Sequence, residues 1–479
     1  MTSSVNLQKN ADIFNRLDYF LGPALLTDKE SVSYAELEQR VAEHALEIEQ
    51  QCINERGEPC LAALAFENNI ESVVNYLAAL RAQVPLLLID PDLNIDMKKA
   101  MYEKLGVSIV LSGKAIMQIA PWPFHNTQKP IASSKAKAAL LLSTSGSSGA
   151  PKSVMLSRDN LISNTNSILD YLPIEQADCA ITTLPLHYSF GLSVLNTHLA
   201  KGARIVLTKH PLMSKEFWQL FREHGVTSLS GVPFHFQMLQ MLRLERMELP
   251  QMRYLAQAGG KMSPDLVEHF EGIAKDRDWT LYVMYGQTEA TARMAYVPPE
   301  VLSGARDSIG KAIPGGRFEI REIGTSELIR SSDQAGELWY FGNNVMLGYA
   351  KAATDWTLER VPQQSLATGD IAEWTDNGLV RITGRLSRFI KIRGKRLQLD
   401  HIEQAMQSIS KDILCCGEDD MLYVVNAPDT ETTHQYLRES LGLHPSLYQI
   451  TEVTELPTLS SGKIDFQKLL TMCNKREGE

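Results

Sequence analysis

The sequence predicts an α/β protein with a large N-terminal domain and a small α+β C-terminal domain. Before Asp307, apolar strand-like runs alternate with helical stretches, which is typical of doubly wound, mostly parallel sheets. After Asp307 glycines become frequent and the strands short, as in a small β subdomain. A basic segment, Gly384–Arg396, then precedes a mixed α/β piece. We therefore expect two doubly wound α/β subdomains, a β subdomain and a separate C-terminal domain.

The composition is that of a globular protein with more than one domain. Of the 479 residues, 44% are hydrophobic and 22% are charged. The net charge of −10 argues against a nucleic-acid binder, which needs a basic surface. The six cysteines show no C-x-x-C spacing, which favours a reducing compartment and gives no zinc signal. The sequence shows no secretory signal and no apolar run of the roughly 18 residues that a membrane span needs, so we expect a cytoplasmic protein.

The first α/β subdomain opens with a helix. Ser33 and Glu36 have the spacing of a capping box, and apolar residues follow at helical intervals from Leu37 to Ile48. Strands are then predicted at Leu61–Phe66, Leu86–Ile89 and Val107–Leu111. Helices are predicted between them at Ile70–Ala82 and Met97–Leu105.

The second α/β subdomain repeats this rhythm. Its predicted strands are Ala180–Leu184, Arg204–Leu207, Thr227–Leu229, Tyr254–Ala256 and Leu281–Met284. Its predicted helices include Phe217–Glu223 and Pro264–Ile273. The β subdomain then has short strands at Phe318–Ile320, Leu338–Phe341, Ile371–Trp374 and Leu379–Ile382. Asn377 and Gly378 predict a hairpin between the last two strands.

The C-terminal piece begins near Arg385–Arg388. Its strongest helical pattern covers Asp400–Ser410. The predicted domains are therefore residues 1–385 and 386–479.

The most informative stretch follows the apolar run Ala138–Leu142. Seven consecutive Ser, Thr or Gly residues come next, and then Ala150, Pro151 and Lys152. Glycines let backbone N–H groups approach an anion, and the hydroxyls and Lys152 add donors and a positive charge. This chemistry predicts a polyphosphate site, with a flexible linker as the alternative. The linker is less favoured because strand-like residues, Lys152–Leu156, follow directly. Pro151 stands where G-x-x-x-x-G-K-[ST] needs its second glycine, which argues against a kinase or GTPase of that type.

Together with this loop, four later segments resemble the adenylate-forming enzymes: acyl-CoA synthetases, peptide-synthetase adenylation domains and firefly luciferase. They are Tyr285-Gly286-Gln287-Thr288-Glu289, Thr368-Gly369-Asp370, Gly384-Arg385 and Leu459–Asp465. The resemblance extends from about Ala138 to Phe466. It implies that ATP and Mg²⁺ are bound and that the C-terminal domain is mobile, rotating between two half-reactions.

The resemblance assigns a role to each matching residue. The implied ATP-binding residues are Thr144, Ser145, Gly146, Ser147, Ser148, Gly149, Lys152, Gly259, Gly260, Tyr285, Gly286, Gln287, Asp370 and Arg385. The implied catalytic residues are Lys463, Glu289 and Thr288, and Glu289 also helps to hold Mg²⁺. Within these sets Tyr285 stacks on adenine and Asp370 accepts hydrogen bonds from the ribose. Lys463 contacts the substrate carboxylate and the α-phosphate.

The acid is expected to contact His187, Tyr188 and Ala258. Related ligases carry a gating histidine in this segment; its place falls on Tyr188, and His187 lies one residue earlier, so either ring could serve. Amino-acid-activating relatives place an aspartate here to pair with the ammonium group. From Cys179 to Leu199 there is no acidic residue, which favours an uncharged acid over an α-amino acid.

The second half-reaction is expected to involve the basic segment. Ser387 occupies the hinge position, where the family usually has Asp or Lys, and Gly394 would line the pantetheine tunnel. The basic charges could meet the phosphates of CoA or an acidic carrier protein.

The predicted function is that of an AMP-forming acyl-CoA synthetase. Two alternatives stay open: an adenylation enzyme that loads the phosphopantetheine of a carrier protein, and a non-catalytic nucleotide or acyl-ligand binding protein. The sequence also leaves a homodimer open.

Overall fold

The computed structural model of the protein describes residues 12–121, 137–144, 152–459 and 464–475, except positions 56, 333, 358, 359, 394, 407 and 411. The chain divides into two compact units. The first comprises Met1–Asp307, Lys311–Arg317 and Phe341–Leu366. The second comprises Ser308–Gly310, Phe318–Tyr340 and Ala367–Glu479.

The first unit contains a seven-stranded sheet. Its strands are β3 (Leu61–Ala65), β4 (Leu86–Ile89), β5 (Val107–Ser112), β6 (Ala115–Gln118), β7 (Leu140–Thr144), β8 (Lys152–Leu156) and β19 (Gly348–Ala350). They lie in the order β19-β8-β7-β4-β3-β5-β6. β7, β4, β3 and β5 are parallel, and antiparallel strands close both edges.

A nine-stranded sheet forms the rest of this unit's core. Its strands are β1 (Pro23–Leu26), β2 (Ser31–Ser33), β9 (Cys179–Ile181), β10 (Arg204–Val206), β11 (Ser228–Gly231), β12 (Tyr254–Gln257), β13 (Thr280–Tyr285), β14 (Ala295–Val297) and β15 (Lys311–Ala312). The order is β15-β14-β13-β12-β11-β9-β10-β1-β2. β1 and β9 to β13 run parallel, which confirms the predicted pair of doubly wound subdomains.

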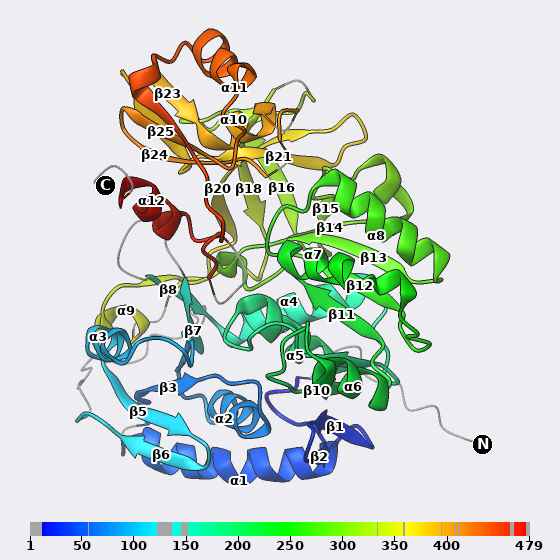
Figure 1. The fold of residues 1–479 in the computed structure, drawn as a ribbon. Coiled ribbons are helices and arrows are strands. Elements are labelled where there is room, and N and C mark those ends of the chain that lie inside the picture. Colours follow the sequence, from blue (N-terminus) through cyan, green and yellow to red (C-terminus); the bar gives the residue numbers. More distant parts are fainter. Residues whose placement is uncertain are drawn as a thin grey trace. The chain divides into compact units, whose positions relative to one another are not determined.

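Helices flank both sheets (Figure 1). They are α1 (Tyr34–Cys52), α2 (Ile70–Arg81), α3 (Ile95–Leu105), α4 (Arg158–Tyr171), α5 (Ser189–Lys201), α6 (Lys215–Glu223), α7 (Pro233–Met241), α8 (Pro264–Asp276) and α9 (Ala353–Thr357), with short 3₁₀ turns η1 (Leu244–Arg246), η2 (Thr288–Ala290) and η3 (Pro299–Gly304). The predicted capping box of α1 is present: the Ser33 side chain accepts from the Glu36 N–H, and the Glu36 side chain accepts from the Ser33 N–H. α4 and α5 pack against each other in the middle of the unit.

The second unit holds three further sheets. The five strands of the predicted β subdomain are β16 (Arg317–Arg321), β17 (Leu328–Ile329), β18 (Gly336–Phe341), β20 (Ser365–Trp374) and β21 (Val380–Arg385), in the order β17-β16-β18-β20-β21. The C-terminal elements are β22 (Phe389–Ile392), β23 (Lys395–Gln398), α10 (Leu399–Met406), β24 (Leu414–Glu418), β25 (Met421–Val425), α11 (Glu431–Gln435), the π turn η4 (Tyr436–Ser440), η5 (Pro445–Leu447), β26 (Tyr448–Thr451) and α12 (Phe466–Lys475).

Two features of the second unit bear on the predictions. The hairpin at Asn377 and Gly378 is confirmed, and Gly378 has the positive φ of 73° that such a turn requires. The predicted domain boundary at Arg385 stays a prediction. The second compact unit contains the β subdomain together with the C-terminal elements. In the part of the chain that the structure describes, no helix is both long and apolar enough to cross a bilayer.

A half-buried histidine near the start of α7, His235, predicts a loss of stability in acid. The Val232 N–H donates to His235 Nδ1 at 3.3 Å, so the ring must be neutral there. Burial lowers the pKa of His235 from 6.5 to about 4. Because the unfolded chain takes up this proton first, the stabilisation is present above pH 6.5 and is lost as the pH falls towards 4.

We expect the free energy of unfolding to fall by about 2 kcal/mol between pH 7 and pH 5 through His235 alone. Urea unfolding at the two pH values measures this loss. The His235→Gln variant is expected to lose less stability than the wild type over the same interval. The loss that remains in the variant is expected to come from other histidines whose pKa burial lowers, such as His187 and His198. An identical loss in both proteins would mean that His235 contributes nothing and would contradict the assignment.

Candidate active site

The predicted phosphate loop joins two paired strands of one sheet. Thr144 at the end of β7 lies opposite Lys152 at the start of β8 in an antiparallel ladder. β7 also pairs in parallel with β4, so the loop follows the carboxyl end of a central strand. An interdomain linker does not connect neighbouring strands of the same sheet, which removes the linker alternative. The loop residues Ser145, Gly146, Ser147, Ser148 and Gly149 lie outside the described residues.

Tyr349 connects this loop to the predicted metal ligand. It lies on β19, paired with Val154 of β8, and the Lys152 ammonium is 5.4 Å from the centre of its ring. Its hydroxyl donates a hydrogen bond of 2.9 Å to Glu289 Oε1. Burial raises the pKa of Tyr349, and the adjacent Glu289 carboxylate adds to the rise, so the phenol stays protonated and keeps donating. A lysine from one sheet and a glutamate that follows β13 of the other thus meet at one aromatic ring.

Backbone contacts hold Glu289 in place. The Met346 N–H donates to the Glu289 carbonyl at 2.9 Å, and Asn344 Nδ2 donates to the Ala290 carbonyl at 2.8 Å. The Thr291 hydroxyl donates to the Asn344 carbonyl at 2.7 Å. The segment after β18 is therefore bonded to η2, and it fixes the direction in which the Glu289 side chain leaves the backbone.

The other residues of the Tyr-Gly-Gln-Thr-Glu motif lie at the carboxyl end of β13. The hydroxyls of Thr288 and Ser189, the first residue of α5, share a hydrogen bond of 3.2 Å. Gln287 Nε2 donates to the Tyr285 hydroxyl at 3.3 Å. Thr288 thus faces α5, and Tyr285 lies half-buried at the strand end.

Gly286 is required for this geometry. A Cβ at this position would lie 1.8 Å from the carbonyl oxygen of Ala292, which is backbone and cannot rotate away. We expect Gly286→Ala to lower the free energy of unfolding by about 3 kcal/mol, as measured by urea titration. Gly272 in α8 is the matched control, because a Cβ there meets nothing within 4 Å. Gly272→Ala should raise stability by up to about 1 kcal/mol. Equal stability of the two variants would refute the steric argument.

The predicted acid-binding residues divide between two places. The Tyr188 hydroxyl lies beside Gly259, where a Cβ would approach it to 2.7 Å, and Gly259 has a positive φ of 83°. Ala258 is buried in a hydrophobic core cluster that also contains Phe190, and the Tyr188 ring packs against this cluster. A Cβ on Gly260 would approach the Pro233 ring to 3.2 Å, and the Gly260 carbonyl accepts from Gln257 Nε2 at 2.8 Å.

His187 belongs to a different environment. Its Nε2 lies 3.6 Å from Asp90 Oδ2 at the end of β4, and burial lowers its pKa. Of the two rings considered for the gate, Tyr188 is therefore the one beside Ala258 and Gly259.

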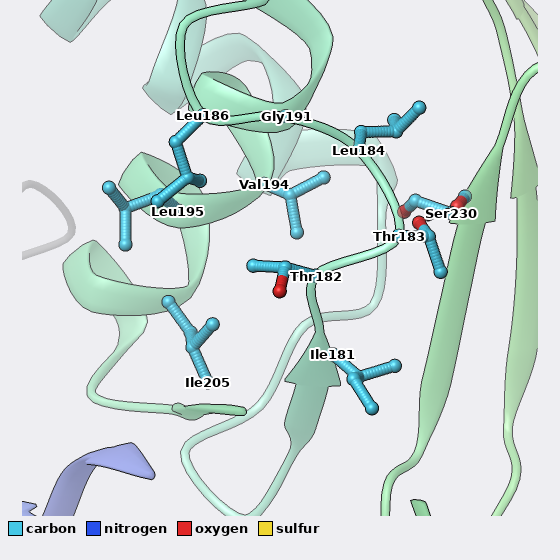
Figure 2. A pocket seen from close by; sticks show the side chains of 10 residues that line it. All are labelled: Ile181, Thr182, Thr183, Leu184, Leu186, Gly191, Val194, Leu195, Ile205 and Ser230. Carbon is cyan, nitrogen blue, oxygen red and sulfur yellow. Dashed lines mark hydrogen bonds between the residues drawn. The ribbon is translucent and has the colours of Figure 1, made fainter. Parts of the chain in front are cut away.

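A small apolar cavity lies next to this segment. Figure 2 shows that its wall comes from β9 and the segment after it, α5, β10 and β11. The lining residues are Ile181, Thr182, Thr183, Leu184, Leu186, Gly191, Val194, Leu195, Ile205 and Ser230. The Thr183 hydroxyl donates to the Ser230 carbonyl, so the wall exposes few polar atoms to the cavity.

In the second unit the predicted ribose-binding pair is assembled across β20 and β21. Asp370 and Arg385 are cross-strand partners, and Arg385 Nε lies 2.8 Å from Asp370 Oδ1. The Asp370 side chain is 2% exposed and the Arg385 side chain 54%, so the pair has one buried and one open end. Ser387, the predicted hinge residue, is exposed two positions later.

Arg388 binds the segment after Ser387 to the C-terminal elements. Its guanidinium pairs with Asp400 and with Glu403, the latter at 2.7 Å, and donates to the Cys415 carbonyl at 2.8 Å. It also stacks at 4.0 Å over the ring of Phe466. The loop carrying Lys463 is closed by a bridge between Thr458 and Ile464, but Lys463 and Gly394 lie outside the described residues.

Within the described residues, no group of three or more His, Cys, Asp or Glu side chains could hold a metal ion by itself. Glu289 therefore belongs to no such group, and Tyr349 links it to Lys152, the residue that follows the predicted phosphate loop. Such a site suits a cation that takes its other ligands from a bound phosphate and from water.

Comparison with known proteins identifies the family. The profile described as AMP-binding enzyme matches residues 22–350, which is more than half of the chain. This chain belongs to the AMP-binding enzyme family. Membership confirms the resemblance to adenylate-forming enzymes that the motifs predicted.

Relatives of this chain include a bacitracin synthase and an acyl-CoA synthetase. Bacitracin synthase 3 of Bacillus licheniformis is 26% identical over 482 residues, which are 93% of this chain and 7% of that synthase. Acyl-CoA synthetase ALT10 of Alternaria alternata is 27% identical over 312 residues, which are 60% of this chain and 54% of that protein. The chain thus spans about half or less of the length of these relatives.

A solved structure shows the same fold. O-succinylbenzoate coenzyme A synthetase (MenE) from Bacillus subtilis, in complex with AMP, matches with a TM-score of 0.74 at 20% identity. The match covers 96% of this chain and 98% of that one. This agreement confirms the predicted fold class of a large N-terminal domain and a small C-terminal one.

Sequence reasoning missed three residues of this region: Ser189, Arg293 and Tyr349. Ser189 and Tyr349 reach the motif only through tertiary contacts, so no local pattern marks them. Arg293 did leave a signal, because it interrupts a run of small and apolar residues four positions after Glu289.

Proposed function

We propose that the protein is an ATP- and Mg²⁺-dependent acid–thiol ligase that acts through an acyl-adenylate. The observation that supports this most is that Tyr349 contacts both Lys152, through its ring, and Glu289, through its hydroxyl. It brings the cationic end of the phosphate loop and the motif carboxylate to one place within the first unit. The MenE structure solved with ATP and magnesium ion gives a precedent for these ligands on the same fold.

In the first half-reaction a carboxylate oxygen of the acid attacks the α-phosphorus of ATP, and pyrophosphate leaves. Lys152 and the loop N–H groups hold the phosphates, and Lys463 offsets the charge that develops where two anions approach. Glu289 and the phosphate oxygens would hold Mg²⁺, which neutralises the charge of the leaving group when bound. Asp370 and Arg385 hold the ribose.

In the second half-reaction a thiol sulfur attacks the acyl carbon, and AMP leaves with its phosphate oxygen. The acceptor proposed is CoA, and the phosphopantetheine of a carrier protein is the second candidate because a peptide synthetase aligns over 93% of the chain. Ser387 provides the hinge, and the basic segment with Gly394 receives the thiol arm. We place the protein in the cytoplasm, where ATP and CoA are available.

Acid-dependent exchange of pyrophosphate into ATP tests the first half-reaction. A panel of carboxylic acids should contain at least one that supports exchange. Absence of exchange across the panel, together with measurable ATP binding, would favour a non-catalytic binding protein. Incubation with free CoA and with phosphopantetheinylated carrier proteins separates the acceptors, because thioester that forms only on a carrier would remove CoA.

A further inference from the structure

Arg293 places a positive charge in the interior of the first unit. The residue is 2% exposed, and its guanidinium carbon lies 3.7 Å above the ring of Phe190. Its backbone is fixed from two sides. Its carbonyl accepts from Asn164 Nδ2 at 2.8 Å and from Asn344 Nδ2 at 3.0 Å, and its N–H donates to Asn164 Oδ1. These bonds fix the backbone from which the buried side chain leaves.

The charge has no anionic partner within the described part of the protein. The polar groups that act on the guanidinium are tyrosines: Tyr171 accepts a hydrogen bond, and Tyr188 lies close enough to interact electrostatically. Nε is buried and has no hydrogen-bond partner among the residues that the structure describes. A guanidinium buried away from water is normally paired with a carboxylate. A contact with an aromatic ring stabilises the charge by much less than the loss of its hydration costs.

The location of the charge suggests what completes it. Phe190, under the guanidinium, belongs to the same buried cluster as Ala258 and Met284, and Tyr188 packs against that cluster. Tyr188 and Ala258 are two of the residues that we assign to the acid. The segment that carries Tyr188, Cys179–Leu199, contains no acidic residue and so cannot neutralise the Arg293 charge.

We propose that Arg293 recognises a second anionic group on the acid, so that the substrate is a dicarboxylic acid. This inference rests on the proposed function, and it replaces the expectation of an uncharged acid with that of an acid that carries a second negative charge. Nε and one Nη form the edge of a guanidinium that binds a carboxylate through two parallel hydrogen bonds. That edge has its Nε unpaired here. The far carboxylate would pair with it while the near carboxylate attacks ATP.

Pairs of acids matched in length test the proposal. Each dicarboxylic acid is compared with its monomethyl ester in the pyrophosphate-exchange assay. The wild type should prefer the diacid by about 10²-fold or more in kcat/KM, because the ester leaves a buried donor unpaired. Arg293→Met should lose this preference, and Arg293→Lys should keep part of it.

A stability measurement separates recognition from a structural role. Replacing an unpaired buried charge by an apolar side chain of similar length should leave the melting temperature unchanged or raise it. Arg317→Met is the matched control: Arg317 stacks on Phe341 at the same 3.7 Å but is exposed, and its loss should not alter the acid preference.

Three results would overturn the inference. They are a wild type that turns over acids without preferring diacids, an Arg293→Met variant that keeps the preference, and an Arg293→Met variant that melts lower and loses activity equally with every acid. If none of the acids supported pyrophosphate exchange, the proposed function itself would be refuted, and the inference with it.

Discussion

Replacing Lys463 with alanine should slow acyl-adenylate formation by about 10²-fold or more and leave ATP binding largely intact. The side chain is expected to act only when the carboxylate and the α-phosphate approach each other. An ammonium about 4 Å from a phosphoryl oxygen contributes roughly 4 kcal/mol at an effective dielectric constant near 20, which is ample for this effect. Single-turnover formation of the adenylate measures the rate, and nucleotide titration measures the binding.

Lys468 provides the control for this experiment. It lies on α12 just beyond the predicted lysine loop and is exposed, so Lys468→Ala changes the same net charge of the tail. Its adenylation rate should match that of the wild type. A Lys463→Ala protein with an unaltered rate would remove Lys463 from the catalytic role.

Glu289→Gln should lower acid-dependent exchange by about 10²-fold and raise the Mg²⁺ concentration needed for half-maximal activity. Glutamine keeps an oxygen that can accept from the Tyr349 hydroxyl, so the local structure is retained while the negative charge is lost. A Mg²⁺ titration of the exchange rate at saturating acid measures both effects.

Tyr349→Phe separates the charge from its hydrogen bond. It removes the hydroxyl that donates to Glu289 and leaves the carboxylate and the ring beside Lys152. Its loss of activity should be about 10-fold or less, the value of one hydrogen bond.

If Glu289→Gln showed the wild-type Mg²⁺ dependence, Glu289 could not be the metal ligand.

Elements with a strong local signal were predicted well. The capping box starts α1 at Tyr34, and β4 covers Leu86–Ile89 as predicted. α5 was not predicted, because nearly all of its residues are buried and no side chain caps its start. α10 was predicted to reach Ser410 but ends at Met406, since Ile409 and Ser410 leave the helix through turn-like bonds to the Met406 carbonyl.

The antiparallel edges were also missed. β14 and β19 are only three residues long and have no turn signal that distinguishes them from loops. Their pairing partners decide their structure: β14 pairs with β13, and β19 with β8. A strand of this length is stable only as part of a sheet, so its existence is not a local property.

The sequence by itself determined the chemistry: a hydroxyl-rich loop with a lysine, a motif glutamate, and a Gly-Asp and Gly-Arg pair that the fold joins across two strands. These features are local, because residue type and spacing fix which groups can bind phosphate, metal and ribose. Only the tertiary structure decided that Tyr349 links Lys152 to Glu289 and that Arg293 is buried with no carboxylate partner among the described residues. Sheet register and burial depend on contacts between distant residues, and no spacing along the chain encodes which charge they leave unpaired.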